Sequence, residues 1–284
     1  MNNDTLTFKA DRNAVLKDFL INECHVSKRL LTKLKQTENG ITVNGVHTRV
    51  IDRISAGDTV ELKISDSGFL EGNPELKVPK AFENESFVVY DKPVGMPVHP
   101  SIKHQGDTLG NCFAADYPNL KFRPVNRLDR DTSGLCVIAK SAYAAALLQN
   151  GIEKTYFAVV QGNLTGEGVI DLPIARECDS IIKRVIREDG QRAVTRYKAI
   201  RGNGRFTLLE IKLETGRTHQ IRVHFSHIGY PLAGDDLYGG DTLYINNQAL
   251  HCGEMLIAFP DSGEKIRVCS GLREDMKKLL ETEN

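Results

Sequence analysis

The sequence predicts an α+β protein with two parts. The larger part is a mixed, mainly antiparallel sheet with flanking helices, and a small αβ unit precedes it. Three observations support this prediction. After residue 84, runs of β-branched and aromatic residues follow one another closely. Helical patterns between these runs are few. A stretch rich in glycine and proline separates this region from a shorter N-terminal one.

Composition sets the broad class of the protein. The chain has 284 residues, of which 40% are apolar and 26% charged, as in globular proteins. It contains no apolar run near the roughly 18 residues of a membrane span, and its first five residues lack a signal-peptide pattern. We therefore expect a cytoplasmic monomer without membrane contact. The six scattered cysteines form no CxxC pair, which favours reduced thiols.

The N-terminal region predicts a compact ααββ-type unit. Apolar residues recur at helical spacing over 14–20 and 27–34, and Ser27 is a candidate cap for the second helix. An alternating strand follows at 41–46 with an Asn-Gly turn, and a second strand lies within 57–64.

Glycine, proline and mixed charges over 65–81 predict a linker. The predicted division is an N-terminal unit at 1–66, a linker at 67–83 and a large domain at 84–284. In the large domain, we expect one helix at 141–149 and strands at the apolar runs 87–90, 135–139, 156–160 and 206–213. Walker A, HExxH and dinucleotide-binding patterns do not occur.

The segment 123–134 carries most of the candidate chemistry. It packs two acids and several arginines immediately before an apolar strand, so we expect a loop on a rigid support. Asp129 lies between Arg127 and Arg130, and nearby positive charge favours an ionised carboxylate that can act as nucleophile or base. A salt-bridged loop without a chemical role is the alternative.

Asn126-Arg127-Leu128-Asp129 and the following Thr132-Ser133-Gly134 closely resemble the central motif of the RluA-type pseudouridine synthases, H-R-L-D-x-x-T-S-G. The resemblance implies that Asp129 is the catalytic residue. Arg127, two residues before it, is a candidate to fill the space left by a flipped-out uridine. Asn126 departs from the pattern, because the family most often has His there.

Three further segments resemble motifs of this family in the expected order. The first, 91–100, contains a K-P-x-G turn and His99, which the resemblance places at the substrate. The second, 153–160, brings Tyr156 against the target base. The third, 213–224, resembles G-R-x-H-Q-I-R-x-H; it implies an ion pair from Arg222 to the catalytic Asp and apolar walls from Leu213 and Ile221.

Each of these segments also has a simpler interpretation. The first is a Pro/Gly turn after a strand, and Tyr156 taken alone is typical of a strand core. The histidines at 219, 224 and 227 suggest a metal only at first sight, because their motif contains no carboxylate or cysteine partner. We therefore expect no metal. The implied isomerisation involves no redox step, so no cofactor is expected.

Between residues 24 and 36 the chain carries basic side chains and no acid, which fits either a solvated helix face or a phosphate-binding face. The order of two helices, a "VNG" strand and a "GDTVEL" strand over 12–64 resembles the S4 RNA-binding domain. This resemblance implies RNA contacts from Lys28, Arg29, Lys33 and Asn44.

The combined prediction is an RNA pseudouridine synthase that isomerises uridines in structured stem-loops of ribosomal RNA, with transfer RNA as an alternative and no DNA target. Such an enzyme must take the uridine out of the stack. One rival is a catalytically inactive RNA-binding protein of the same fold. Another is an aspartate-dependent glycosidase, which needs a second acid such as Asp131.

Overall fold

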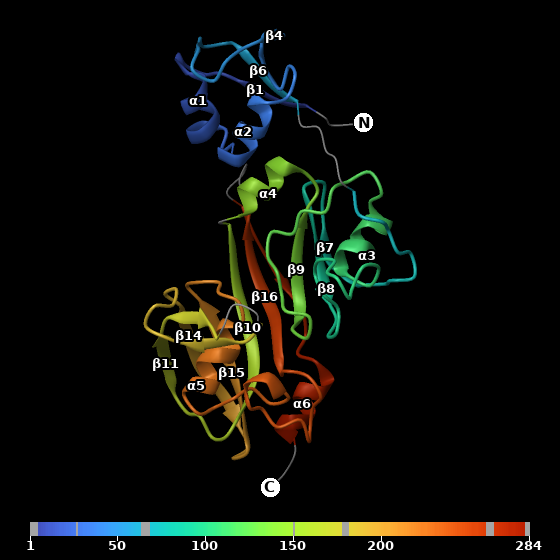
Figure 1. The fold of residues 1–284 in the computed structure, drawn as a ribbon, viewed down its shortest axis with the longest axis vertical. Coiled ribbons are helices and arrows are strands. Elements are labelled where there is room, and N and C mark those ends of the chain that lie inside the picture. Colours follow the sequence, from blue (N-terminus) through green and yellow to red (C-terminus); the bar gives the residue numbers. More distant parts are fainter. Residues whose placement is uncertain are drawn as a thin grey trace.

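The protein consists of two units stacked along its long axis, with the N-terminus in the upper unit and the C-terminus at the far end of the lower one (Figure 1). This computed structural model describes residues 5–26, 28–63, 69–149, 151–177, 182–259 and 264–281, and the side chain of residue 29 is also outside the description. Ser27, the expected helix cap, lies outside the described residues.

The N-terminal unit is a four-stranded sheet in the order β1-β6-β3-β4 with helices against it. Its apolar side chains form a separate core around Leu20, Leu34 and Val60. Its elements are β1 (Thr5–Lys9), β2 (Ala14–Val15), α1 (Leu16–Asp18), the π-helix η1 (Phe19–Glu23), α2 (Lys28–Lys35), β3 (Ile41–Val43), β4 (Val46–His47), β5 (Arg53–Ile54) and β6 (Thr59–Lys63). Strand β1 was not expected from the sequence.

The larger unit is built on a nine-stranded sheet in the order β11-β14-β15-β10-β16-β9-β8-β7, with β17 paired to β16. A separate hairpin is formed by β12 and β13. The strands are β7 (Lys80–Glu83), β8 (Phe87–Lys92), β9 (Ser133–Ala139), β10 (Ile152–Gln161), β11 (Glu167–Asp171), β12 (Ile174–Arg176), β13 (Arg184–Ile186), β14 (Val194–Gly202), β15 (Phe206–Leu213), β16 (Leu250–Ala258) and β17 (Lys265–Cys269).

The described helices of this unit are short and lie at the edges and faces of the sheet (Figure 1): α3 (Leu109–Asp116), α4 (Ala142–Leu148), α5 (Gln220–His227), the 3₁₀ turn η2 (Asp236–Tyr238) and α6 (Glu274–Glu281). Helix α4 lies next to the N-terminal unit, and its Tyr143 ring meets Phe8 of β1 at 5.7 Å between centroids. None of the described helices has the length and apolar character required to cross a membrane.

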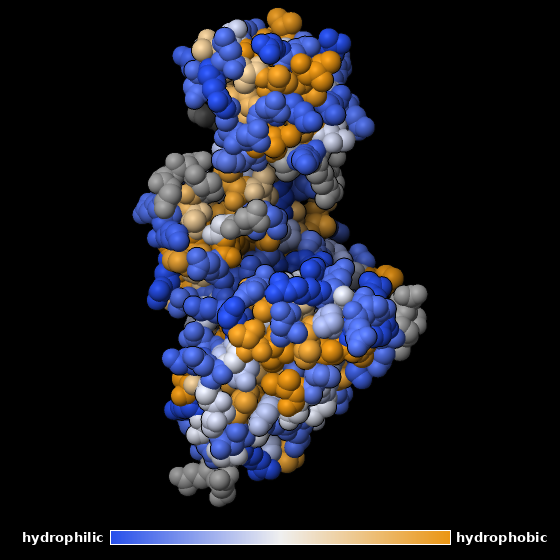
Figure 2. All heavy atoms as spheres, turned by 90° about the vertical axis from the view of Figure 1, so that its left-hand side faces the viewer, coloured by the Kyte–Doolittle hydropathy of each residue, from blue (hydrophilic) through white to orange (hydrophobic). Residues whose placement is uncertain are grey.

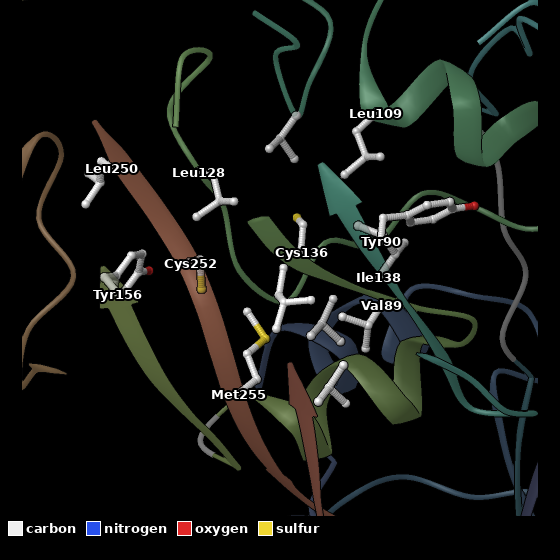
Figure 3. Packing of buried hydrophobic residues seen from close by; sticks show 14 of the residues in the cluster. Val89, Tyr90, Leu109, Leu128, Cys136, Ile138, Tyr156, Leu250, Cys252 and Met255 are labelled. Carbon is white, nitrogen blue, oxygen red and sulfur yellow. The ribbon is translucent and has the colours of Figure 1, made fainter. Parts of the chain in front are cut away.

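Pairing in the large sheet is antiparallel except between β16 and β9, where Cys252 lies opposite Gly134. The prediction of a mixed, mainly antiparallel α+β fold is therefore confirmed. All seven residues of β9 are buried, and Figure 3 shows the apolar packing of this strand with its neighbours β8 and β16. The centre of the sheet is therefore closely packed on both faces, which restricts its motion.

The predicted linker, residues 67–83, extends too far toward the C-terminus. Residues 80–83 form β7, which pairs with β8 in the large sheet. Before that strand, Val78 is buried in the same core, and the Asn73 amide donates a 2.7 Å hydrogen bond to the carbonyl of Gly106. The composition of this segment is typical of a linker, but Leu76, Val78 and Phe82 pack on the larger unit.

Figure 2 shows the side of the molecule that carries β11 and β14. Hydrophilic side chains form a band across its middle, between the upper unit and the more apolar surface below. Formal charge is zero, with 37 basic and 37 acidic residues, so any RNA-binding field must be local.

Candidate active site

Asp129 lies in the loop that leads into β9. Its carbonyl accepts a 3.1 Å hydrogen bond from the amide of Thr132, which closes the loop into a turn. Strand β9 begins directly after this loop and runs very close to β16. A β-carbon at Gly134 would lie only 2.3 Å from the carbonyl oxygen of Cys252, so only glycine fits there. The Asp129 side chain is 30% exposed. The carboxylate is thus presented to a cavity from a loop anchored at the core of the sheet.

Arg222, from α5, joins this carboxylate to a second one. Its Nη1 lies 3.2 Å from Oδ2 of Asp129, while Nε and Nη2 donate to both oxygens of Asp235 at 2.7 and 2.8 Å. Burial by itself would lower the pKa of Arg222, but the hydrogen bonds and charges of the two carboxylates raise it. Arg222 therefore carries a permanent positive charge beside Asp129.

His219 is a third group beside Asp129. Its backbone has a positive φ of 57°, which is uncommon for a residue other than glycine. The ring Nδ1 is 2.9 Å from the hydroxyl of Tyr238, and Nε2 is 3.7 Å from Oδ2 of Asp129. Burial is the main cause that lowers the pKa of His219. A neutral imidazole therefore lies beside the carboxylate at pH 7.

Asp129 borders an inner pocket of about 70 Å³. Apolar walls come from Leu128, Leu213, Ile221 and Leu250, and Tyr156 lies among them. Figure 3 shows Tyr156 on β10 and Leu250 and Cys252 on β16 at one edge of the core, with Leu128 nearby. The pocket continues into an outer cleft of about 770 Å³, which shares Asp129 and Tyr156 with it.

The structure brings together every residue that the sequence placed at the catalytic and substrate site. Six of them line the inner pocket: Arg127, Asp129, Tyr156, Leu213, Ile221 and Arg222. His99 lines the outer cleft, where its ring meets Phe122 at 5.3 Å between centroids. Their common location supports the roles predicted for them, which remain predictions.

The hydroxyl of Tyr156 is held in an apolar environment. Tyr156 is 7% exposed and follows a register shift between β10 and β16. Burial, followed by the influence of Cys252 and Asp129, raises the pKa of Tyr156 well above its usual value. The phenol is therefore protonated at pH 7, and it can accept a proton only if it passes its own proton to another base at the same time.

Lys92 stabilises the loop that carries Asp129 through hydrogen bonds from its buried ammonium group. The sequence did not reveal this role. It is fully buried, and its Nζ donates to the carbonyls of Pro93, Met96 and Arg130 at 2.8, 2.8 and 2.9 Å. Burial lowers the pKa of Lys92 to about 8, so the ammonium form still predominates at pH 7. This lysine ties the K-P-x-G turn to the loop that carries Asp129.

Asp235 is a further functional residue without a predicted role. It is 1% exposed and follows the third motif in a Gly-Asp-Asp segment. A pair of adjacent acids, Asp235 and Asp236, within a segment of apolar and small residues was the available signal. Its partner was not apparent, because Arg222 and Asp235 belong to different elements that meet only in the folded chain.

Asn126 has a structural role in the fold. Its Oδ1 accepts a 2.8 Å hydrogen bond from the amide of Val137, and Nδ2 donates to the carbonyl of Leu135 at 3.3 Å. The side chain is buried and ties the loop to β9. Both interactions involve backbone groups of the strand, which explains how Asn is accommodated where the family motif has His.

The N-terminal candidates are placed differently. Lys28 and Lys33 lie on α2 with exposed side chains, whereas the side chain of Arg29 is outside the described part. The amide of Asn44 is engaged within the protein, since Nδ2 donates to Asp58 at 2.8 Å and Oδ1 accepts from the amide of Thr59 at 2.9 Å. Asn44 therefore stabilises its turn, and its role as an RNA contact stays a prediction.

Asp131 does not reach the pocket. Its carboxylate pairs with Arg130 at 2.8 Å, and Asp129 is the one carboxylate that lines the inner pocket among the described residues. Within the described part of the chain, the inner pocket therefore offers no second acid of the kind a glycosidase needs. His219 and His224 make hydrogen bonds to Tyr238 and to Thr195.

Comparison with known proteins identifies the class. Residues 86–227 match the family described as RNA pseudouridylate synthase. The chain is 38% identical over 274 residues to the uncharacterized RNA pseudouridine synthase YjbO of Bacillus subtilis, covering 92% of this chain and 97% of that protein. It is 36% identical over 282 residues to the ribosomal large subunit pseudouridine synthase D of Pseudomonas aeruginosa, covering 90% and 87%.

Among solved structures, the human RNA pseudouridylate synthase domain containing 1 has a TM-score of 0.60 at 22% identity, covering 71% of this chain and 86% of that one. This likeness shows the fold. Together with the sequence matches, it means that the chain belongs to the RNA pseudouridylate synthase family. The predictions of an RluA-type pseudouridine synthase and of an isomerase acting on RNA are confirmed.

Proposed function

We propose that this enzyme converts uridine to pseudouridine in structured ribosomal RNA of the cytoplasm, with Asp129 as the catalytic carboxylate. The observation that carries the proposal is the position of Asp129 at the junction of the inner pocket and the cleft, 3.2 Å from Arg222. The relatives named ribosomal large subunit pseudouridine synthase D support the choice of ribosomal RNA.

The reaction breaks the bond from ribose C1′ to uracil N1, turns the base and joins C5 to C1′, while the C5 proton leaves and N1 gains one. The inner pocket suits these needs. Asp129 provides a carboxylate at the sugar, and Arg222 orients it. Leu213 and Ile221 offer walls without hydrogen-bonding groups, which retain the freed base and allow it to turn.

Arg127 is suited to replace the uridine in the RNA stack. It is exposed at the mouth of the site, and the described residues provide no hydrogen-bond or ion-pair partner for it. Flipping a nucleotide costs a few kcal/mol, and stacking of a guanidinium against the neighbouring bases offsets part of that cost. Burial lowers the pKa of His99, and the nearby charge of Arg127 lowers the pKa of His99 further.

The N-terminal unit is proposed as an S4-like RNA-binding unit. Helix α2 buries Leu31 and Leu34 in the core and exposes Lys28, Lys33 and Lys35. A basic helix face of this kind contacts phosphates without reading sequence. It would increase affinity for RNA, while the active-site cleft selects the uridine.

Tritium release tests the catalytic role. In vitro transcripts of ribosomal RNA carrying tritium at uridine C5 are incubated with the native enzyme, with Asp129→Asn and with Asp131→Asn. The second variant is the matched control, because Asp131 is in the same loop but pairs with Arg130 outside the pocket. We expect release from the native enzyme and from Asp131→Asn, and none from Asp129→Asn.

Each rival function has its own result in this experiment. RNA binding without release by the native protein would indicate an inactive RNA-binding protein. Free uracil would indicate a hydrolase. Carbodiimide mapping of pseudouridine in ribosomal and transfer RNA, from cells with and without the protein, then locates the target; a site found only in transfer RNA would refute the ribosomal assignment.

A further inference from the structure

We propose that a basic groove beside the β12–β13 hairpin binds backbone phosphates of the RNA strand that flanks the target uridine. This inference rests on the proposed function and extends it to a second binding subsite. The groove measures about 360 Å³ and lies between the hairpin, residues 189–191 and the loop 216–218. It is separate from α2 of the N-terminal unit, which is the RNA-binding face predicted from sequence.

The charge of the groove comes from Arg176, Arg184 and Arg217. Within the described part of the chain, none of the three has a carboxylate partner. Asp189 is the one carboxylate among the described lining residues. It forms an ion pair with Arg187, whose Nη2 lies 3.1 Å from Oδ2 of Asp189. The groove therefore has a positive charge that an anionic ligand can neutralise.

Two of these arginines are held in place by main-chain carbonyls. Nη1 of Arg184 donates to the carbonyl of Ile182 at 2.7 Å, and Nε of Arg217 donates to the carbonyl of Arg192 at 3.1 Å. A guanidinium has five N–H groups, so each retains further donors. Fixed guanidinium groups bind phosphate oxygens well, because their paired donors match the geometry of the anion.

Arg217 connects this groove to the uridine site. It lines the groove, the outer cleft and the inner pocket, and Gly216 and Thr218 line both groove and cleft. A β-carbon at Gly216 would meet no atom within 4 Å, so the passage is open at this point. An RNA strand with its uridine in the inner pocket can therefore continue through this passage into the groove.

Salt-dependent binding tests the proposal without relying on catalysis. Filter binding of an in vitro ribosomal RNA transcript is measured at several KCl concentrations for the native enzyme and for the double variant Arg176→Gln/Arg184→Gln. Both residues line the groove and neither lines the inner pocket. Each lost phosphate contact lowers the slope of log K against log salt by about 0.7–0.9, so we expect a slope lower by about 1–2 and binding about tenfold weaker or more.

Two further variants sharpen the result. Gly216→Glu places a negative charge in the open passage and is expected to weaken binding as well. Arg192→Gln is the matched control, because Arg192 is on the adjacent segment but pairs with Asp171 at 3.0 Å and does not line the groove. It should bind within about twofold of the native enzyme and keep its salt slope.

Kinetics separate this inference from the proposed function. If the groove only binds phosphates, Arg176→Gln/Arg184→Gln raises KM and leaves kcat near the native value at saturating RNA. An unchanged salt slope in that variant would overturn the groove as a phosphate subsite, even in an active enzyme. Conversely, a native protein that forms no pseudouridine would refute the proposed function, whereas a reduced slope in the variant would still support phosphate binding by the groove.

Discussion

Arg222 is held by Asp235 through two hydrogen bonds of 2.7 and 2.8 Å, on a carboxylate that is almost fully buried. The same guanidinium reaches Asp129 with its remaining nitrogen, Nη1. Asp235 therefore acts as a positioning residue. It fixes the orientation of the cation that in turn orients the proposed catalytic carboxylate, without lining the inner pocket itself.

Asp235→Asn should impair both stability and catalysis. The amide offers one acceptor oxygen and directs N–H groups at the guanidinium, so a buried ion pair is broken. We expect the free energy of unfolding to fall by about 3–5 kcal/mol and kcat to fall about 100-fold through misplacement of Arg222. Urea denaturation and tritium release measure the two effects. The exposed neighbour provides the control: Asp236→Asn should change stability by no more than about 0.5 kcal/mol.

Tyr156→Phe separates stacking from proton transfer. The ring is retained, so KM for RNA should change little, whereas loss of a hydroxyl that relays the C5 proton should lower kcat by about 10²–10⁴-fold. Single-turnover tritium release measures this step. Tyr197→Phe on β14 is a suitable comparison, because Tyr197 packs against Phe225 and does not line the pocket. Native kcat in Tyr156→Phe would exclude the hydroxyl from the proton path.

Lys92→Met should destabilise the Asp129 loop. Methionine is of similar length but cannot donate to the carbonyls of Pro93, Met96 and Arg130, which would lose their donor in a buried site. We expect a loss of about 2–4 kcal/mol in the free energy of unfolding and a lower kcat. The exposed Lys77→Met is the control for removal of a lysine charge. Equal stability of the two variants would show that the Lys92 hydrogen bonds contribute little.

Stability should fall in mild acid. His224 and His251 are 0% and 2% exposed, and burial is the main cause that lowers the pKa of both. Below a pH of about 6.5, the unfolded chain takes up protons that the folded chain does not. The free energy of unfolding therefore falls with pH, by at most about 1.4 kcal/mol per pH unit for each histidine.

Urea denaturation at pH 7.5 and 5.5 measures this dependence. His224→Gln should lose less stability between the two pH values than the native protein, although it starts from a lower value. His47→Gln, with an exposed side chain on β4, should retain the native dependence. A pH dependence as large in His224→Gln as in the native protein would contradict the assignment to His224.

The sequence alone predicted the class of fold and the set of residues at the site. Local runs of apolar residues identify strands such as β9 and β15, because burial of one or both faces of a sheet imposes an apolar pattern on neighbouring residues. Asp129 and Tyr156 were found because they lie in short motifs that resemble one enzyme family. Information of this kind is contained in consecutive residues and does not require the path of the chain.

Only the tertiary structure showed how these residues are held and charged. Asp129 and Arg222 are 93 residues apart, and they meet because α5 packs near the loop before β9. The burial of Lys92 and Asp235, and the protonated phenol of Tyr156, depend on side chains contributed by several elements. Electrostatic properties arise from distance and from exclusion of water, which are fixed when the sheet assembles. The sequence thus determined which chemistry the chain can perform, and the packing of α5, β9 and β10 determined where the charges and protons lie.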